Sequence, residues 1–204
     1  MAADGFTVTE WWWVRHALVR GHDGHYLGRL DPPADLAEPA ALDSLAARLP
    51  AEAVWLTTPL ARARQTAEAL AGHCGVAMPC VEPDLIEQDF GLWQGRGYDA
   101  VYAETGEDAW RSPGTLRPDG GESFAEMMPR IAGAVERLSL LHAGRRIVAI
   151  AHAGTIRAAL AQALDLSPDR ALGFQIDTLT VTRIDRIAGE RPGEIYWRLP
   201  CVNR

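Results

Sequence analysis

Cysteine is scarce in this sequence, and its spacing fits no metal site. The 204 residues include Cys74, Cys80 and Cys201, an odd number. A zinc knuckle needs a second pair of ligands, and none accompanies Cys74 and Cys80. We therefore expect free thiols in a reducing compartment, which favours a cytoplasmic protein.

Long apolar runs and an excess of positive charge are also missing. No segment approaches the roughly 18 consecutive apolar residues of a membrane-spanning helix. The N-terminus MAADGFTVTE lacks a basic stretch followed by a long apolar one, so we expect no signal peptide. The net charge of -7 argues against nucleic acid and anionic membranes as partners, but it leaves room for a local basic pocket that binds a small anion.

The sequence does contain enough apolar residues for a substantial core. Hydrophobic residues make up 48% and charged residues 23%, the balance of an ordinary globular protein. Because domains usually hold about 100–200 residues, we expect a single domain over residues 1–204.

Short apolar runs alternate with helical patterns along the chain. The apolar runs predict β-strands at residues 10–15, 53–58, 78–81, 145–152, 178–186 and 194–200. Helices are expected at residues 37–49, at 60–74, from Ser123 onward, and at 155–164. This order predicts an α/β fold, a three-layer αβα sandwich around a mainly parallel mixed sheet, in which the last two runs pair as a hairpin.

Several local features refine this prediction. Thr58 is expected to cap the second helix, with Pro59 in its first turn. Pro129 should kink or restart the helix that contains it. The run Trp11–Trp13 is expected to pack in the sheet. Residues 83–120 are rich in Gly, Asp, Glu and Trp, so we expect a loop-rich cap over a site.

Cationic and imidazole side chains follow the predicted strands. Arg15 and His16 end the first strand, Arg62 lies just after the second, and His152 ends the strand over 145–152. Because ligands of open α/β sheets bind at the carboxyl ends of strands, we expect these groups to converge. The helix that opens at Gly154-Thr155 adds free backbone N–H groups and a positive dipole end. Together they predict a phosphate-binding socket.

Five motifs in order resemble those of a known family. They are Arg15-His16-Ala17, Thr58-Pro59-Leu60-Ala61-Arg62-Ala63-Arg64-Gln65-Thr66-Ala67, Leu85-Ile86-Glu87 with Gly91 and Trp93-Gln94-Gly95, Gly120-Gly121-Glu122-Ser123, and Ala151-His152-Ala153-Gly154. On these residues the chain resembles the histidine phosphatase superfamily, in its phosphoglycerate-mutase-like branch. Its length is similar to that of small phosphatases such as the α-ribazole phosphatase-like proteins.

The resemblance implies a role for each matched residue. His16 would be the nucleophile that takes the phosphoryl group, and Arg15, Arg62 and His152 would bind the oxygens of that group. Glu87 would protonate the leaving alkoxide and then accept a proton from water. Because the guanidinium groups supply positive charge, we expect neither a metal nor a cofactor.

The motifs also depart from the family pattern. Ala17 and Ala153 stand where the family usually has glycine, and a methyl group there would strain the pocket if φ were positive. His22 occupies a position where the family often has asparagine, and we expect it to line the site. For the acid, Glu82, Asp84, Asp89 and Glu122 are alternatives to Glu87, while Arg20 and Arg64 are expected to face solvent or the rim.

The favoured function is a metal-independent phosphomonoesterase that acts on a small phosphorylated metabolite. A bisphosphate-primed phosphoglycerate mutase is the alternative enzyme, but the 65-residue interval from Glu87 to His152 contains no added basic stretch for a second phosphate. A catalytically weak phospho-ligand binding module is the alternative from another class. The sequence leaves open whether the protein forms a homodimer.

Overall fold

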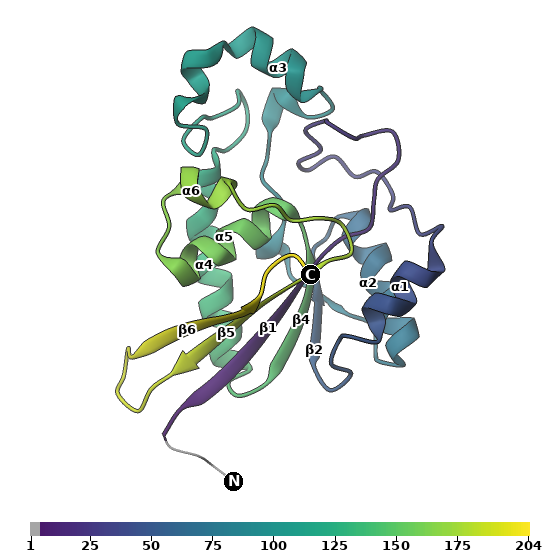
Figure 1. Ribbon diagram of the computed structural model, residues 1–204, viewed down its shortest axis with the longest axis vertical. Helices are drawn as coiled ribbons and strands as arrows, with labels where there is room; N and C mark the ends of the chain where they lie inside the picture. Colours follow the sequence, from purple (N-terminus) through teal and green to yellow (C-terminus); the bar gives the residue numbers. More distant parts are fainter. Residues whose placement is uncertain (1–4) are drawn as a thin grey trace.

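The computed structural model describes residues 5–204, and these fold around one mixed β-sheet (Figure 1). The strands are β1 (Thr7–Arg15), β2 (Val54–Thr57), β3 (Cys80–Val81), β4 (Arg146–Ala151), β5 (Val181–Ala188) and β6 (Ile195–Cys201). Their order across the sheet is β3-β2-β4-β1-β5-β6. The first four are parallel, whereas β5 runs antiparallel to β1 and pairs with β6 as a hairpin. The predicted mainly parallel mixed sheet is confirmed.

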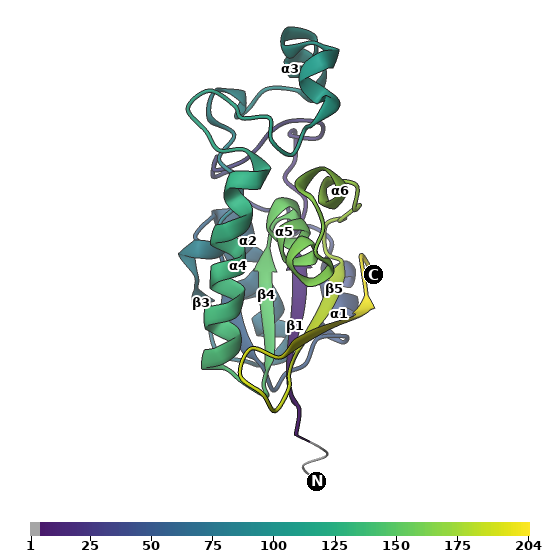
Figure 2. The same cartoon turned by 90° about the vertical axis from the view of Figure 1, so that its left-hand side faces the viewer.

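Helices cover both faces of this sheet. The helices are α1 (Pro39–Ala46), α2 (Ala61–Cys74), α3 (Tyr98–Thr105), α4 (Phe124–Leu141), α5 (Ala153–Leu164) and α6 (Pro168–Leu172), with short 3₁₀ turns at Pro83–Leu85, Gly91–Trp93 and Glu107–Arg111. Figures 1 and 2 show α4 and α5 on one face and α1 and α2 on the other, which confirms the three layers. The helix α3 lies beyond the carboxyl end of the sheet. None of the helices within residues 5–204 is long and apolar enough to cross a membrane.

The alternation of side chains along β1 divides the core in two. Trp11 and Trp13 point toward α4 and α5, and their rings stack with centroids 4.7 Å apart. Val14 points the other way and packs with the buried residues of α1 and α2. This period of two is what a strand buried on both faces requires. The tryptophan run therefore packs in the sheet, as predicted, and anchors the strand that ends in His16.

One local prediction is wrong, and one of the two alternatives for Pro129 is excluded. The helix α2 begins at Ala61, and Leu60 precedes it without a side-chain cap, so the predicted capping role of Thr58 is wrong. The Thr58 hydroxyl instead lies 2.8 Å from Nε2 of His152. Pro129 does not restart the helix that holds it, since α4 is continuous from Phe124 to Leu141. Its buried stripe, on both sides of Pro129, holds the helix on the sheet despite one missing hydrogen bond.

A buried hydrogen bond ties the tryptophan run to α4. Nε1 of Trp11 donates to Oγ of Ser139 over 2.9 Å, and both side chains are buried. The variant Ser139→Ala should lower the free energy of unfolding by about 1–3 kcal/mol, because it leaves the indole N–H without a partner. Urea unfolding measures this, with exposed Ser44→Ala of α1 as the control that should stay within about 0.5 kcal/mol of wild type. Equal stability of both variants would contradict the prediction.

Candidate active site

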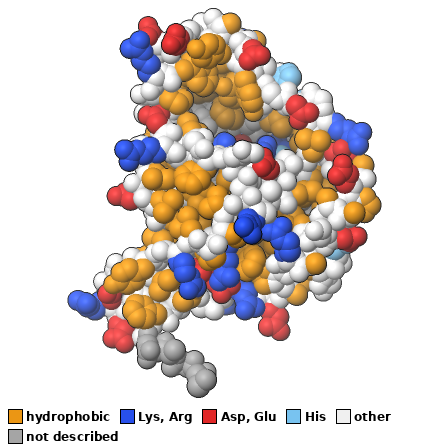
Figure 3. Space-filling view, viewed as in Figure 1, with side chains coloured by type: hydrophobic (Ala, Val, Ile, Leu, Met, Phe, Trp, Pro, Cys, Tyr) orange, Lys and Arg blue, Asp and Glu red, His pale blue; other side chains and the backbone are white. Residues whose placement is uncertain are grey.

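A cavity of about 420 Å³ opens at the carboxyl end of the parallel strands. Strand β1 and the first turns of α2 and α5 form its floor, while residues 22–28 and the segment 83–120 form its walls. Figure 3 shows it as a hollow below a hydrophobic rim, with charged atoms at its base. The lining includes the predicted site residues Arg15, His16, His22, Arg62, Glu87 and Gly154.

Two hydrogen bonds hold the ring of His16 and determine its tautomer. Nδ1 lies 2.7 Å from the carbonyl oxygen of Ala17, which can only accept, so Nδ1 carries the proton. Nε of Arg62 donates to Nε2 of His16 over 3.2 Å, so Nε2 keeps its lone pair. Burial, together with the positive charge of Arg62, holds the pKa of His16 well below its usual value of 6.5. The result is a neutral imidazole whose unprotonated nitrogen is Nε2.

Arg62 is a buried residue of the site. Its side chain is 1% exposed, and Nη1 and Nη2 donate to the carbonyl oxygens of Leu30 and Gly28 over 2.7 Å each. Carbonyl groups orient the guanidinium but do not neutralise it. The positive charge therefore remains available to an anion.

The same arrangement holds two more guanidinium groups. Nη1 of Arg15 donates to the carbonyl oxygen of Ile176 over 2.6 Å, and Nε of Arg157 donates to that of Phe174 over 2.8 Å. One loop after α6 thus positions both side chains. Arg157 lines the cavity but was not predicted. The sequence did contain a signal for Arg157: it follows Ala153 by four residues, and this spacing places the two residues on one face of α5.

His152 lies behind His16, with ring centroids 5.2 Å apart. It precedes α5 but its ring makes no capping bond, and the Thr58 hydroxyl contacts its Nε2 instead. Burial, followed by the charge of Arg62, lowers the pKa of His152 well below 6.5. Within residues 5–204, Nδ1 of His152 and Nε of Arg15 are buried without a hydrogen-bond partner.

Glu87 reaches across the start of α5. Its Oε2 accepts from the Gly154 N–H over 3.2 Å, and its Oε1 accepts from the Gln88 N–H over 2.9 Å. A Cβ at Gly154 would lie 2.3 Å from Oε1 of Glu87, so the approach needs a residue without a side chain. Gly154 therefore admits the carboxylate to the floor of the cavity.

The four alternative acids contact backbone N–H groups or arginines outside the cavity. Glu122 accepts from the Asp89 N–H and binds Arg29 and Arg130, and Asp89 accepts from Gly91. Glu82 and Asp84 both pair with Arg137 on the outer side of α4. Among the described residues, these four acids are absent from the cavity lining, whereas Glu87 is part of it.

The remaining predicted residues separate into two groups. His22 is half-buried and lines the cavity. Thr155 does not, since its buried hydroxyl donates to the Leu85 carbonyl oxygen over 3.1 Å and so supports the segment before Glu87. Its side chain therefore lends no support to the predicted substrate contact. Of the predicted rim residues, Arg20 pairs with Asp35 and Arg64 is exposed.

Ala17 and Ala153 are accommodated without backbone strain. The non-glycine residues with positive φ in the described chain are Asp165, Leu179 and Asn203, so neither alanine needs a glycine conformation. Ala17 is fully buried, and its N–H donates to Oγ1 of Thr66 over 3.0 Å. Ala153 lines the cavity, whereas Ala17 does not, and neither residue strains the backbone of the site.

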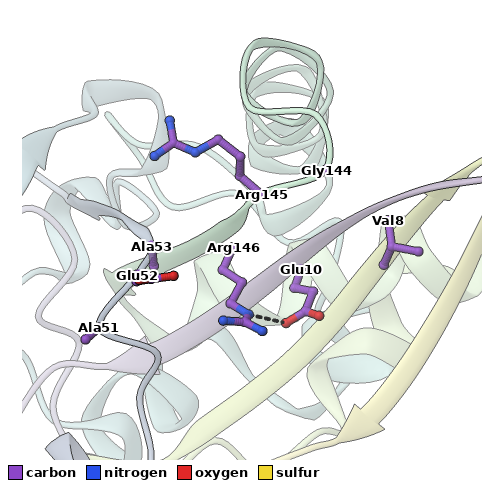
Figure 4. Close-up of a pocket in the computed structure, with 8 residues that line it drawn as sticks. All are labelled: Val8, Glu10, Ala51, Glu52, Ala53, Gly144, Arg145 and Arg146. Carbon is purple, nitrogen blue, oxygen red and sulfur yellow. Dashed lines mark ion pairs between the residues drawn. The ribbon is translucent and has the colours of Figure 1, made fainter. Parts of the chain in front are cut away.

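A second cavity, of about 550 Å³, lies at the opposite end of the sheet (Figure 4). Its side chains include Glu10 and Arg146, which form an ion pair over 3.4 Å. It contains none of the predicted site residues. No group of three or more His, Cys, Asp or Glu side chains within the described range is placed to hold a metal ion.

The order of motifs and this geometry agree with the family comparison. Residues 11–195 match the histidine phosphatase superfamily (branch 1), so the chain belongs to that family. Phosphoserine phosphatase 1 of Hydrogenobacter thermophilus is 30% identical over 179 residues, which cover 84% of this chain and 83% of that protein. A bifunctional protein of Mycobacterium tuberculosis is 32% identical over 119 residues, 55% of this chain. The match spans 31% of the length of that mycobacterial protein.

Solved structures share the fold across nearly the whole chain. The native mycobacterial glucosyl-3-phosphoglycerate phosphatase has a TM-score of 0.84 at 24% identity, and the match covers 96% of this chain and 99% of the other. A putative alpha-ribazole-5'-P phosphatase from Escherichia coli has a TM-score of 0.80 at 22% identity, with 96% of both chains covered. The α/β fold is therefore that of known histidine phosphatases.

The two buried imidazoles predict a loss of stability in acid. Below about pH 6.5 the unfolded chain protonates His16 and His152, whereas the folded protein keeps both neutral until a much lower pH. The unfolded state then binds more protons, so the free energy of unfolding falls by up to about 1.4 kcal/mol per pH unit for each histidine. The free energy of unfolding, measured with denaturant at several pH values between 8 and 5, should change less steeply with pH for His16→Asn than for wild type. Equal slopes below pH 6.5 would contradict this.

Proposed function

We propose that the protein is a phosphomonoesterase that works through a phosphohistidine formed on Nε2 of His16. The observation that carries the proposal is the neutral ring of His16, whose Nδ1 proton is held by the Ala17 carbonyl while Nε2 keeps its lone pair. A nitrogen nucleophile must be unprotonated and oriented, and the buried ring meets both requirements.

The surrounding charges support attack on a phosphate ester. Arg15, Arg62 and Arg157 line the same cavity, and carbonyl contacts leave their charges uncancelled. Such preorganised cations stabilise the negative charge on the equatorial oxygens of a transferring phosphoryl group. The N-terminal turn of α5 adds backbone N–H groups at the same place.

The proposed reaction has two displacements. Nε2 of His16 forms a bond to phosphorus while the ester P–O bond breaks, and protonated Glu87 gives its proton to the departing alkoxide. The Glu87 carboxylate then takes a proton from water, whose oxygen attacks phosphorus as the N–P bond breaks. Inorganic phosphate leaves, and His16 and Glu87 return to their starting states.

The cavity wall favours the phosphatase over the mutase. A mutase must also hold the second anionic group of a bisphosphate. Among the described residues, those of segment 83–120 that line the cavity include no arginine or lysine: Glu87, Gln88, Phe90, Trp93, Tyr98, Trp110, Pro113 and Leu116. The binding-module alternative rested on Ala17 and Ala153, and their unstrained backbone removes its main support. A cytoplasmic location and a homodimer remain predictions.

Loss of the nucleophile is the direct test. Hydrolysis of an aryl phosphate, measured with a chelator present, should fall by about 10³-fold or more in His16→Ala. His73→Ala, an exposed histidine of α2, is the matched control and should keep wild-type activity. After rapid mixing, mass spectrometry should find one phosphoryl group on the peptide with His16. Phosphate binding without turnover would contradict the enzyme proposal. Isomerisation of phosphoglycerate that requires a bisphosphate primer would favour the mutase.

A pair of glycine variants tests the role of Glu87. In Gly154→Ala the new methyl group displaces the Glu87 carboxylate, so kcat should fall by about 10–100-fold. Gly133→Ala is the control, since Gly133 is an exposed position of α4 and a Cβ there meets nothing within 4 Å. It should keep kcat and gain up to about 1 kcal/mol of stability. Wild-type kcat in Gly154→Ala would remove Glu87 from the proposed role.

A further inference from the structure

Aromatic rings cover the cavity opposite its charged floor. Tyr26 lies at the centre, with ring centroids 4.9 Å from Phe90, 5.4 Å from Trp93 and 4.6 Å from Tyr98. Trp110 stacks on Trp93 with centroids 5.9 Å apart and an interplanar angle of 24°. All five rings line the cavity, and we call them the aromatic roof.

The aromatic roof carries no positive charge because the nearby arginines are engaged elsewhere. The twenty basic residues of the chain are all arginines, and three of them lie in segment 83–120. Arg96 pairs with Glu104, Arg111 with Asp108, and Arg117 with Glu126. Those three arginines are absent from the described cavity lining.

Other groups near the aromatic roof also disfavour an anion. Burial and the neighbouring Tyr98 raise the pKa of Tyr26 to about 12, so its phenol stays neutral. Asp23 lines the same wall and would repel a carboxylate or a second phosphate. Among the described lining residues the arginines lie at the floor, where Arg15 and Arg62 flank His16, while His22 and His25 lie on the wall.

The division of the cavity sets the shape of its ligand. The phosphoryl group must lie at the floor, next to His16, so the alcohol part of the ester extends toward the aromatic roof. The volume of about 420 Å³ falls within the roughly 300–1,000 Å³ of small-molecule sites and has room for a ring beside the phosphate. Stacked aromatic surfaces favour flat apolar groups.

We propose that the alcohol part of the substrate is a planar aromatic or similarly apolar group that packs in the aromatic roof and bears no second anionic group. This inference rests on the proposed phosphatase function. Arg157 is the competing feature, since its guanidinium could instead pair with a carboxylate of a small phospho-acid.

Two alkyl esters with leaving alcohols of similar acidity give a clean test. The value of kcat/KM for 2-phenylethyl phosphate should exceed that for ethyl phosphate by about 10–100-fold, because the phenyl group leaves water for the aromatic roof. O-phosphoserine and 3-phosphoglycerate should be poorer than 2-phenylethyl phosphate. A ratio near one would overturn the inference. A preference for either phospho-acid would also overturn it, and it would assign Arg157 to acid recognition.

Variants of the aromatic roof locate the effect. Trp110→Leu should reduce the ratio between the two esters by about fivefold or more. Tyr98→Leu, where 50% of the side chain is exposed, should reduce it too and serves if Trp110→Leu fails to fold. Tyr196→Leu on β6 is the control, with an equally exposed ring outside the cavity, and should keep the wild-type ratio. An unchanged ratio in folded variants of the aromatic roof would contradict the proposal.

The inference and the proposed function can fail separately. If no ester is hydrolysed, the phosphatase proposal fails, and calorimetry then compares binding of 2-phenylethylphosphonate and ethylphosphonate, which have no ester bond. Tighter binding of the phenyl compound would still support an aromatic ligand. Equal binding would overturn it independently of turnover.

Discussion

The structure of the site depends on the way the ring of His16 is held between a carbonyl and a guanidinium. The Ala17 carbonyl accepts the Nδ1 proton, and Nε of Arg62 donates to Nε2. Each contact alone would orient the ring, but both together also determine which nitrogen keeps its lone pair. Burial keeps the ring neutral, because a charged imidazole would lose its hydration beside a fixed cation. The fold thus holds the proposed nucleophile in its neutral, oriented form before any ligand arrives.

Backbone carbonyl groups of distant segments hold the guanidinium groups around His16. The carbonyls of Gly28 and Leu30 hold Arg62, and the loop with Phe174 and Ile176 holds the other two guanidinium groups. If carboxylates held these side chains, ion pairs would cancel the charge that an anionic substrate needs. Carbonyl groups orient the guanidinium groups by hydrogen bonds and leave their net positive charge in place. The Glu87 carboxylate lies over the start of α5 and contacts backbone N–H groups.

The segment 83–120 supplies most of the aromatic cover opposite the charged floor of the cavity. It places aromatic rings over the floor, and its three arginines form ion pairs away from the cavity lining. A charged base and an uncharged aromatic cover divide the cavity into a phosphate end and an apolar end. The shared fold of histidine phosphatases accounts for the first half, whereas the second half is where this chain would express its own specificity.

The sequence alone determined the class of fold, the order of its strands along the chain and most of the charged floor. Those features depend on local patterns: a strand that ends in Arg15-His16, and a helix that opens after His152. Only the tertiary structure decided that Thr58 contacts His152 instead of capping α2, that Thr155 supports a loop, and that Arg157 joins the floor. The physical reason is range, because capping and periodicity act within a few residues, whereas carbonyl contacts and ring packing join segments that only the folded sheet brings together.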